Sequence, residues 1–382
     1  MRIGVLTGGG DVPGLNVAIK VIVSRAEDRG WTVVGIRRGW LGLLSVDAKD
    51  AASREEWTTP LNHERVRTID RTGGTILHTS RIEPQKLPKK LAPPRLLSSF
   101  GTGDQIDATR EVVRAVEQLG LDAVIPLGGD GTLRFAARLA GEGVPVVSIP
   151  KTMDNDVYGT DYAIGFSTAI TRSVDAITAL RTTAGSHERV MVVELFGRLC
   201  GQTALYAGLL AAADRTVIAE APFDPAAVAA LLEQDRLANP SRYSVCVISE
   251  GAKTKGGELH EKAGSDAYGR KALGGIGEVL GEACRRASPE GAIVQNLGYL
   301  MRSGVPDAAD RMIALGFGAQ ALQLLEEKRS GHMCALVNGR FTAVPIEAPL
   351  QGAKRVNVAT SYDAQAYRAR IKTVDGLALF GI

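Results

Sequence analysis

Residues 149–156 read Ile149-Pro-Lys-Thr-Met-Asp-Asn-Asp156, and the other motifs of the chain converge on this stretch. An apolar run over 144–149 precedes it and predicts a buried strand. Ligands of doubly wound sheets bind just beyond the carboxyl ends of the strands. On an extended backbone, carboxylates two residues apart point the same way. We therefore expect Asp154 and Asp156 to face one ligand, one holding a metal and the other taking a proton from a hydroxyl. The alternative is an Asx-rich turn.

The composition is that of an α/β protein. The chain has 382 residues, enough for two domains that each bury a core, and it is 45% apolar and 23% charged with 44 glycines. Many glycines in such a protein lie at turns between strands and helices. The formal net charge of +3 is too small to indicate a nucleic-acid partner.

Nothing in the sequence points to a membrane or to an oxidising compartment. No apolar segment reaches 18 residues, and the amino terminus leads directly into a strand, so we expect a cytoplasmic protein without a membrane partner. The cysteines are scattered and form no CxxC pair, which predicts buried free thiols rather than structural zinc: Cys200, Cys246, Cys284 and Cys334.

Apolar runs of strand length alternate with helical periodicity along most of the chain, which predicts βα units and mostly parallel sheets. The predicted strands are 2–7, 32–36, 123–127, 144–149, 190–194, 216–219, 243–249 and 293–297, and the predicted helices are 15–29, 106–119, 133–139, 169–180, 203–212, 224 onward, 277–287 and 308–325. Residues 37–103 look irregular. We expect two Rossmann-like three-layer domains, 1–165 plus about 303–350 and 166–302 plus about 351–382, with the active site in the cleft between them.

Two glycine-rich turns follow predicted strands. Residues 7–14 read Thr-Gly-Gly-Gly-Asp-Val-Pro-Gly and open a helix, so their backbone N–H groups could cradle a phosphate; a plain tight turn is the alternative. Residues 127–132 read Leu-Gly-Gly-Asp-Gly-Thr, where an acid could hold Mg²⁺ between two phosphates. This second motif indicates a phosphoryl donor but occurs in lipid and NAD kinases as well.

Several arginines lie at predicted turns and strand ends. Arg81 comes shortly after the Gly73-Gly74 turn, Arg189 and Arg198 flank one predicted strand, and Arg302 follows another. A guanidinium at a strand end can hold a phosphate with two parallel hydrogen bonds. Each of these arginines could equally be a solvated surface charge, and Glu250 could be a sugar ligand or a surface acid.

Taken together, these motifs resemble the phosphofructokinase family. They stand in the family's order: Gly9-Gly-Asp-Val-Pro-Gly-Leu-Asn16, Gly73-Gly-Thr75 with Arg81, Gly128-Gly-Asp-Gly-Thr132, Pro150-Lys-Thr-Met-Asp-Asn-Asp156, Gly159-Thr-Asp-Tyr162 and Ser186-His-Glu-Arg189. The resemblance covers nearly the whole chain. Lipid and NAD kinases share the Gly128–Thr132 motif but lack Thr-x-Asp-Asn-Asp.

The resemblance implies a Mg²⁺-dependent glycolytic kinase that phosphorylates the 1-hydroxyl of fructose 6-phosphate, with the donor on the first domain and the sugar phosphate on the second. Asp154 would be the base, Asp130 and less directly Asp156 would handle Mg²⁺, and Arg81 and Arg198 would balance charge during transfer. The implied donor-binding residues are Gly9, Arg81, Gly129, Asp130, Gly131, Thr132 and Lys151. The implied sugar-phosphate residues are Thr152, Asp154, Asp156, Arg189, Phe196, Gly197, Arg198, Glu250, Tyr299 and Arg302. Thr152, Gly9 and Arg198 would join Asp154 in catalysis.

Three properties stay open. Gly131 favours ATP as donor, because aspartate at this position in the family goes with pyrophosphate, whereas Lys151 is usual in pyrophosphate users; we give Gly131 more weight because a flexible lysine can swing aside. Ile293 stands where the family usually has a phosphate-binding arginine, so another acceptor such as sedoheptulose 7-phosphate is an alternative. A homologue that binds sugar phosphate without turnover is a third possibility. The resemblance also implies a homodimer or homotetramer in which Arg189 reaches a neighbouring subunit.

Overall fold

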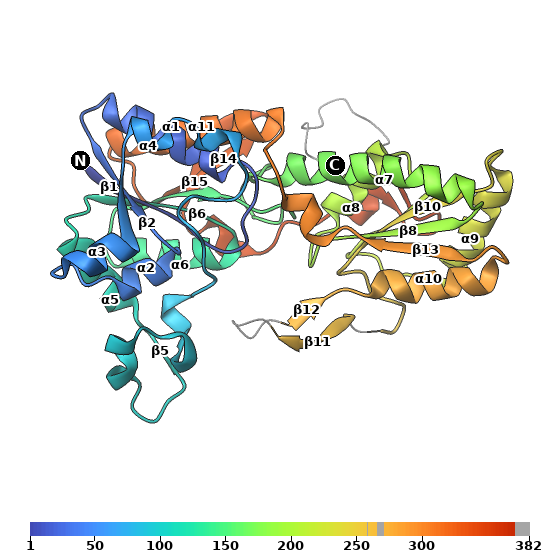
Figure 1. Cartoon of the computed structure of the whole chain (residues 1–382), viewed down its shortest axis with the longest axis horizontal. Helices are drawn as coiled ribbons and strands as arrows, with labels where there is room; N and C mark the ends of the chain where they lie inside the picture. Colours follow the sequence, from blue (N-terminus) through green and yellow to red (C-terminus); the bar gives the residue numbers. More distant parts are fainter. Residues whose placement is uncertain (258, 266–270, 371–382) are drawn as a thin grey trace. The chain divides into compact units, whose positions relative to one another are not determined.

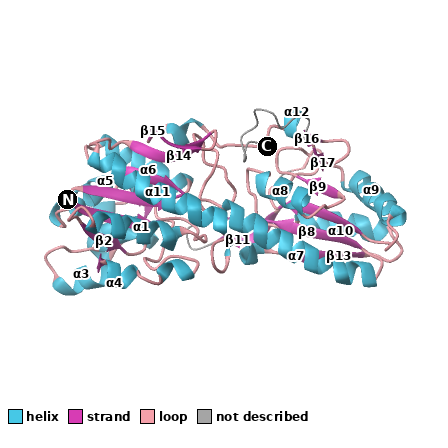
Figure 2. Cartoon of the chain, turned by 90° about the horizontal axis from the view of Figure 1, so that it is seen from above, coloured by secondary structure: helices cyan, strands magenta, loops and turns pink. Residues whose placement is uncertain are grey.

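The computed structural model describes residues 1–257, 259–265 and 271–370. The chain forms two compact α/β units, so the predicted fold class is confirmed (Figures 1 and 2). One unit consists of Met1–Thr152, Val157–Gly165 and Ser303–Gly352, and the other of Met153–Asp156, Phe166–Arg302 and Ala353–Ile382. Residues 153–156, which carry two of the predicted site carboxylates, therefore group with the second unit, although the strand before them belongs to the first.

The first unit is built on a seven-stranded sheet in the order β15-β14-β7-β6-β1-β2-β3. Its strands are β1 (Arg2–Thr7), β2 (Thr32–Ile36), β3 (Thr58–Leu61), β6 (Ala123–Gly128), β7 (Val147–Pro150), β14 (His332–Val337) and β15 (Arg340–Pro345). The five inner strands are parallel, and only β3 and β15 run antiparallel to their neighbours. Helices α1 (Leu15–Glu27) and α11 (Ala308–Glu326) cover one face, while α2 (Trp40–Ser45), α5 (Thr109–Gln118) and α6 (Asp130–Gly141) cover the other (Figure 1).

The region predicted to be irregular, 37–103, contains short elements that the sequence pattern did not reveal. They include α2, α3 (Ala51–Trp57), strand β3, α4 (His63–Val66) and strand β4 (Leu87–Pro88), which pairs with β5 (Gln105–Ile106) just after this region. Each is too short to show a hydrophobic period, because a helix needs several turns and a strand several alternations before the pattern is readable. The sequence therefore indicates an irregular region but does not locate the short elements within it.

The second unit has a four-stranded parallel sheet in the order β13-β8-β10-β9. Its strands are β8 (Val190–Leu195), β9 (Arg215–Val217), β10 (Ser244–Ser249) and β13 (Ala292–Asn296), and its helices are α7 (Phe166–Ser186), α8 (Gln202–Leu210), α9 (Pro225–Ala238) and α10 (Ile276–Ala287). Alternate residues of the strands face opposite ways. Val190 and Val192 join the core with α9 and α10, whereas Met191 and Val193 join the core with α7 and α8. Small pairs β11–β12 (Glu261–Ser265, Lys271–Leu273) and β16–β17 (Tyr362–Asp363, Arg368–Ala369) and the short α12 (Val358–Ser361) complete it.

Each sheet has a point where the strand order reverses. In the first unit the chain adds β2 on one side of β1 and later β6 on the other. In the second unit β10 and β9 lie on one side of β8, and β13 is added on the other. Ligands of open α/β sheets bind at such switch points, outside the carboxyl ends of the strands. The loops after β1 and β6, and those after β8 and β13, are therefore the expected ligand positions of the two units.

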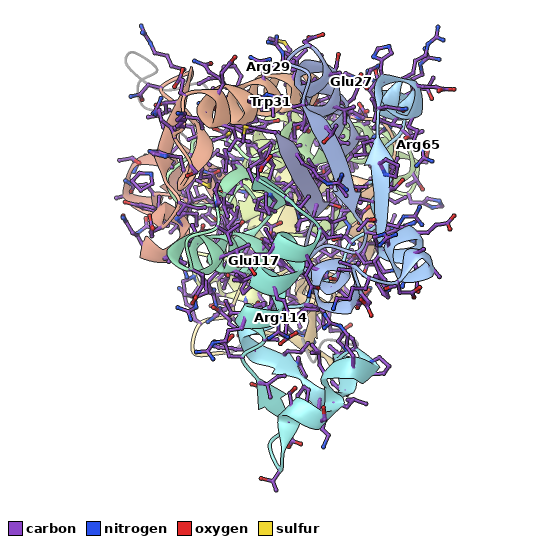
Figure 3. All side chains as sticks on the ribbon, turned by 90° about the vertical axis from the view of Figure 1, so that its left-hand side faces the viewer. Glu27, Arg29, Trp31, Arg65, Arg114 and Glu117 are labelled. Atoms are coloured by element: carbon purple, nitrogen blue, oxygen red, sulfur yellow. The ribbon has the colours of Figure 1, made fainter. Side chains whose placement is uncertain are left out.

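The surface and the thiols of the described residues are unremarkable for an α/β protein. Acidic and basic side chains are mixed on the outer side of the first unit, where Figure 3 labels Glu27, Arg29, Trp31, Arg65, Arg114 and Glu117. The guanidinium of Arg29 lies 5.9 Å from the centre of the Trp31 ring.

The four cysteines are free and buried, as predicted. In the described ranges, no helix is both long enough and apolar enough to cross a bilayer.

We predict that Gly165→Ala destabilises the protein by about 2–4 kcal/mol, combining a strained positive φ with overpacking. Gly165 has a φ of +103°, and an added Cβ would lie 2.5 Å from the Cβ of Val12 in the turn before α1. Gly120→Ala is the matched control, because its φ is +62° but a Cβ there meets no atom within 4 Å. Urea unfolding should show a clearly larger loss for Gly165→Ala; equal losses would contradict the close approach.

Candidate functional site

The segment after β7 forms a turn and is not extended. Asn155 has a φ of +53°, a left-handed conformation that asparagine tolerates better than most residues. Its side-chain amide donates to Oε1 of Gln202 at 2.8 Å, and the Thr203 hydroxyl donates to the Met153 carbonyl at 2.9 Å, so the turn is held on the amino-terminal end of α8. The expectation of an extended backbone was thus wrong, and the Asx-rich turn is the structure found.

The carboxyl of Asp154 lies in surroundings that oppose its ionisation. Burial, followed by the negative charges of Asp156 and Glu250, raises the pKa of Asp154 from 3.8 to about 8. A hydrogen bond from the backbone N–H of Arg198 and the positive charge of Arg302 lower the pKa, but by less. Although part of the residue reaches solvent, the protein atoms crowded around the carboxyl dominate its solvation. A carboxyl with a pKa near neutrality is suited to accept a proton.

The loops after β8 and β10 are bonded to each other around this carboxyl. The Ser249 hydroxyl donates to the Gly197 carbonyl at 2.6 Å, and the N–H of Glu250 donates to the Leu195 carbonyl at 2.8 Å. Gly197 has a φ of +144°, and an added Cβ would lie 2.6 Å from the Ser249 hydroxyl. These contacts fix the backbone from which Arg198 and Glu250 extend.

Arg302 stacks on two aromatic rings at the carboxyl ends of β8 and β13. Its guanidinium carbon lies 4.6 Å from the ring centre of Tyr299 and 5.9 Å from that of Phe196, and the two rings meet edge to face at 5.6 Å. Tyr299 is 70% exposed, so this group forms a surface on which a ligand can settle. A guanidinium can stack on an aromatic face while its N–H groups lie in its own plane, in a fork that matches carboxylate and phosphate groups.

Arg189 lies apart from the other predicted sugar-phosphate residues of its unit. It precedes β8, whereas Phe196 and Arg198 follow the same strand. Six strand residues span about 20 Å. Within one chain, the second unit therefore brings together Asp154, Asp156, Phe196, Gly197, Arg198, Glu250, Tyr299 and Arg302 at the carboxyl edge of its sheet, but not Arg189.

In the first unit, Lys151 lies against the glycine turn after β1. Lys151 is only 3% exposed, its ammonium donates to the Gly10 carbonyl, and an added Cβ on Gly9 would lie 3.3 Å from its Nζ. The N–H of Gly9 donates to the Ser80 carbonyl, just before Arg81, and that of Gly8 donates to the Leu127 carbonyl. These two amides are thus engaged within the protein. The turn leaves room for the Lys151 ammonium. The hydrogen bond to Gly10 holds this side chain in place, so it does not swing aside.

The second glycine turn is shaped around Thr132. Added Cβ atoms on Gly8 and Gly128 would lie 2.4 Å and 2.3 Å from atoms of the Thr132 side chain, which is buried. The glycines at these two positions thus make room for Thr132 rather than for a phosphate. Helix α6 begins at Asp130, so Asp130, Gly131 and Thr132 form its first turn, with Gly129 before it. The first N–H groups of a helix have no partner inside the helix and favour an anion.

Glu83 is a residue of this site that the sequence analysis missed. An added Cβ on Gly131 would lie 2.7 Å from Oε1 of Glu83, so the space opened by the glycine is occupied by a carboxylate. The position of Glu83, two residues after Arg81, was the only signal available. No sequence pattern indicates that the Glu83 side chain approaches the first turn of α6.

The residues of this site could hold a magnesium ion together with the phosphates of a ligand. They do not form a site in which protein side chains supply all of the metal ligands. In the described part of the chain, no group of three or more His, Cys, Asp or Glu side chains could hold a metal. The Asp130 side chain is 61% exposed and pairs with Arg134 at 2.6 Å. Mg²⁺ is commonly bound by one or two carboxylates together with substrate phosphates, and an exposed ion pair costs at most about 1 kcal/mol to open.

A family model described as Phosphofructokinase matches residues 2–325. The chain belongs to the phosphofructokinase family. It is 37% identical to the ATP-dependent 6-phosphofructokinase 3 of Streptomyces coelicolor, over 96% of this chain and 99% of the relative. It is 39% identical to the pyrophosphate--fructose 6-phosphate 1-phosphotransferase of Thermoproteus tenax, over 91% and 92%. Phosphofructokinase from Saccharomyces cerevisiae superposes with a TM-score of 0.73 at 22% identity, over 92% of this chain and 45% of that longer chain.

We predict that Asp154→Asn makes this phosphofructokinase family member more stable, increasingly so as the pH rises. Asp154 ionises near pH 4 in the unfolded chain and near pH 8 in the fold, so folding becomes less favourable between these values, and the full cost applies above pH 8. Asparagine carries no such cost. Since one pKa unit corresponds to about 1.4 kcal/mol, the advantage of the variant should grow by on the order of 4 kcal/mol between pH 5 and pH 8 in urea unfolding.

Asp363→Asn provides a control of opposite sign. Hydrogen bonds from the N–H groups of Ala366 and Gln365 lower the pKa of Asp363, so its ionised form stabilises the fold above pH 4. Relative to the native protein, this variant should become less stable as the pH rises from 3 to 5. A pH-independent difference for Asp154→Asn would contradict the raised pKa of Asp154.

Proposed function

We propose that this chain transfers the γ-phosphoryl group of ATP to the 1-hydroxyl of fructose 6-phosphate, as a 6-phosphofructokinase. The observation that carries the proposal is the Asp154 carboxyl, with its pKa raised to about 8 and the Arg198 N–H donating to it. The relatives of 36–40% identity named ATP-dependent 6-phosphofructokinase support the same activity.

In the proposed reaction, ionised Asp154 takes the proton of the sugar 1-hydroxyl as that oxygen attacks the γ-phosphorus. A bond forms between this oxygen and phosphorus, the bond to the bridging oxygen breaks, and ADP leaves. The Thr152 hydroxyl donates to the moving phosphoryl group, and Arg81 and Arg198 offset its charge. Such transfers depend on positioning and electrostatic stabilisation more than on covalent help.

The first unit would hold the donor. The first turn of α6 would face its phosphates, Lys151 would supply a cation beside Gly9, and Asp130 would hold Mg²⁺, with Asp156 assisting less directly. When bound, this ion neutralises charge on the phosphates. Opening the exposed pair between Asp130 and Arg134 frees the carboxylate at small cost.

The second unit would hold the acceptor. Arg302, stacked on Tyr299 and Phe196, would grip the 6-phosphate, and Glu250 would accept hydrogen bonds from sugar hydroxyls beside Gly197. The position of Arg189 at the opposite end of β8 supports the proposal that it serves the site of a neighbouring subunit in a homodimer or homotetramer. Ile293 packs against the α7–α8 core and supplies no charge. A longer sugar phosphate such as sedoheptulose 7-phosphate is therefore the second candidate acceptor.

Pyrophosphate is the second candidate donor, and two observations favour it. Lys151 is buried and bonded to Gly10, which weakens the earlier argument that it can swing aside. The Glu83 carboxylate also fills the space that Gly131 would leave for a nucleotide phosphate. We still propose ATP, because Glu83 reaches this position by a flexible side chain, whereas an aspartate at position 131 would be fixed on the helix.

We predict that Asp154→Asn lowers kcat at least 100-fold, since a positioned general base contributes about 10²- to 10⁴-fold. In the native enzyme, kcat/KM for the sugar phosphate should fall as the pH drops through about 8, because only ionised Asp154 accepts a proton. Steady-state assays between pH 6 and pH 9.5 measure both effects. Activity within tenfold of the native rate, or the same acid limb in the variant, would show that another group is the base.

We predict that Glu83→Gln raises kcat/KM for ATP about fivefold, because like charges about 4 Å apart repel by about 1 kcal/mol even in water, and leaves pyrophosphate kinetics unchanged. A matrix of ATP or pyrophosphate with fructose 6-phosphate or sedoheptulose 7-phosphate, for native enzyme and variant, measures this and identifies both substrates. Glu117→Gln, on the outer face of α5 (Figure 3), is the matched control. An unchanged or lower value with ATP would contradict the interpretation of Glu83.

A further inference from the structure

A second buried carboxyl, that of Glu194, lies at the carboxyl end of β8 and is 2% exposed. It accepts hydrogen bonds from two segments that follow β8 in the sequence by about 80 and 100 residues. The N–H of Gly277 donates to Oε2 at 2.7 Å, and the N–H of Gly275 lies 3.0 Å from Oε2 and 3.1 Å from Oε1. The side-chain amide of Asn296 donates to Oε1 at 2.6 Å. The carboxyl thus joins β8, the start of α10 and the end of β13.

This carboxyl fills the position where an open α/β sheet commonly binds an anion. Glu194 lies beside Asn296 at the switch point between β8 and β13. The amino terminus of α10 points its first N–H groups here, and such groups attract a phosphate. Because Glu194 already accepts two of them, the N-terminus of α10 is engaged. Recognition of a ligand phosphate in this unit therefore falls to side chains such as Arg302.

A series of contacts connects Glu194 to the cluster formed by Arg302, Tyr299 and Phe196. The backbone carbonyl of Glu194 accepts from the N–H of Leu297 at 3.1 Å. Gly298 follows with a φ of +45°, and an added Cβ there would lie 2.9 Å from Oδ1 of Asn296 and 3.9 Å from the Phe196 ring. The N–H of Phe196 in turn lies 3.3 Å from the Met301 sulfur. The Glu194 carboxyl thus holds Asn296 at the end of β13, and the contacts of the residues that follow connect this point to Phe196, Tyr299 and Arg302.

We propose that Glu194 is a positioning residue that sets the affinity for the phosphorylated sugar by holding Phe196, Tyr299 and Arg302 in one stacked arrangement. This inference rests on the proposed function. Glu194 does not touch the reacting atoms, so its loss acts on acceptor binding. Donor binding depends on residues of the first unit and is unaffected.

The test compares Glu194→Ala with native enzyme in steady-state assays. The variant leaves the N–H groups of Gly275 and Gly277 and the Asn296 amide without their acceptor, and we expect the KM for the sugar phosphate to rise at least tenfold. The KM for the donor and kcat should stay within threefold. Asp214→Asn is the matched control: it also removes a carboxylate of this unit that accepts a backbone N–H, from Val245 at 2.8 Å, but at the amino-terminal end of β10. Its kinetics should equal those of native enzyme.

If Glu194→Ala does not fold, exchanging the acid and the amide between positions 194 and 296 tests the same contact. Asn296→Asp places two carboxyls 2.6 Å apart and should raise the KM for the sugar phosphate. Adding Glu194→Gln restores a donor and an acceptor, and should return that KM to within threefold of the native value. An unchanged sugar-phosphate KM in a folded variant, a parallel rise in the donor KM, or no recovery in the double variant would overturn the proposal. Absence of sugar phosphorylation by native enzyme would instead refute the proposed function.

Discussion

The backbone between Lys151 and Asn155 is the constraint on which the site depends. The N–H of Lys151 donates to the Gly128 carbonyl and that of Thr152 to the Ile164 carbonyl, which ties these residues to the first unit. From Met153 onward the chain is bonded to the start of α8 in the second unit. A residue proposed to act on the donor and one proposed to act on the acceptor, Thr152 and Asp154, are thus only two positions apart. Covalent connectivity keeps them near each other.

The carboxyls of Glu194 and Asp154, both in the second unit, differ in function because their surroundings differ. Glu194 is surrounded by hydrogen-bond donors, which satisfy both its oxygens and make it a fixed point of the fold. Burial and the negative charges of Asp156 and Glu250 raise the pKa of Asp154 to about 8, so it holds its proton up to a pH near 8. The first arrangement favours structure and the second favours proton transfer, at a cost to stability that the rest of the unit offsets.

Much of the fold was predictable because long parallel strands and their helices leave readable periods. Strands β1 and β2 begin and end where the apolar pattern predicted, and α1 and α11 were recognised within two residues, whereas α7 extends three residues before and six beyond its predicted range. The elements of 37–103 were not, since none is long enough to show a period. The left-handed Asn155 was missed in favour of an extended backbone, because the alternation of two aspartates looks the same in both.

The candidate site was predictable as a set of residues, but not as a set of contacts. Sequence motifs identified Asp130, Asp154 and Arg302, whose chemistry is apparent from residue type. They could not show that Thr132 fills the space beside Gly8 and Gly128, or that Lys151 is buried against Gly10. Glu83 and Glu194 were missed for the same reason: each acts on a segment far away in sequence, and only the fold shows which segment that is.

Each unit has its own sheet, its own core and its own strand-order reversal, and this separation bears on how such enzymes evolve. A substitution beside α6 changes contacts of the first sheet without disturbing the packing beneath Tyr299, and the reverse also holds. Preferences for the two co-substrates can therefore drift independently through small local changes. Descendants of one ancestor could exchange one phosphate source for another while keeping the same sugar.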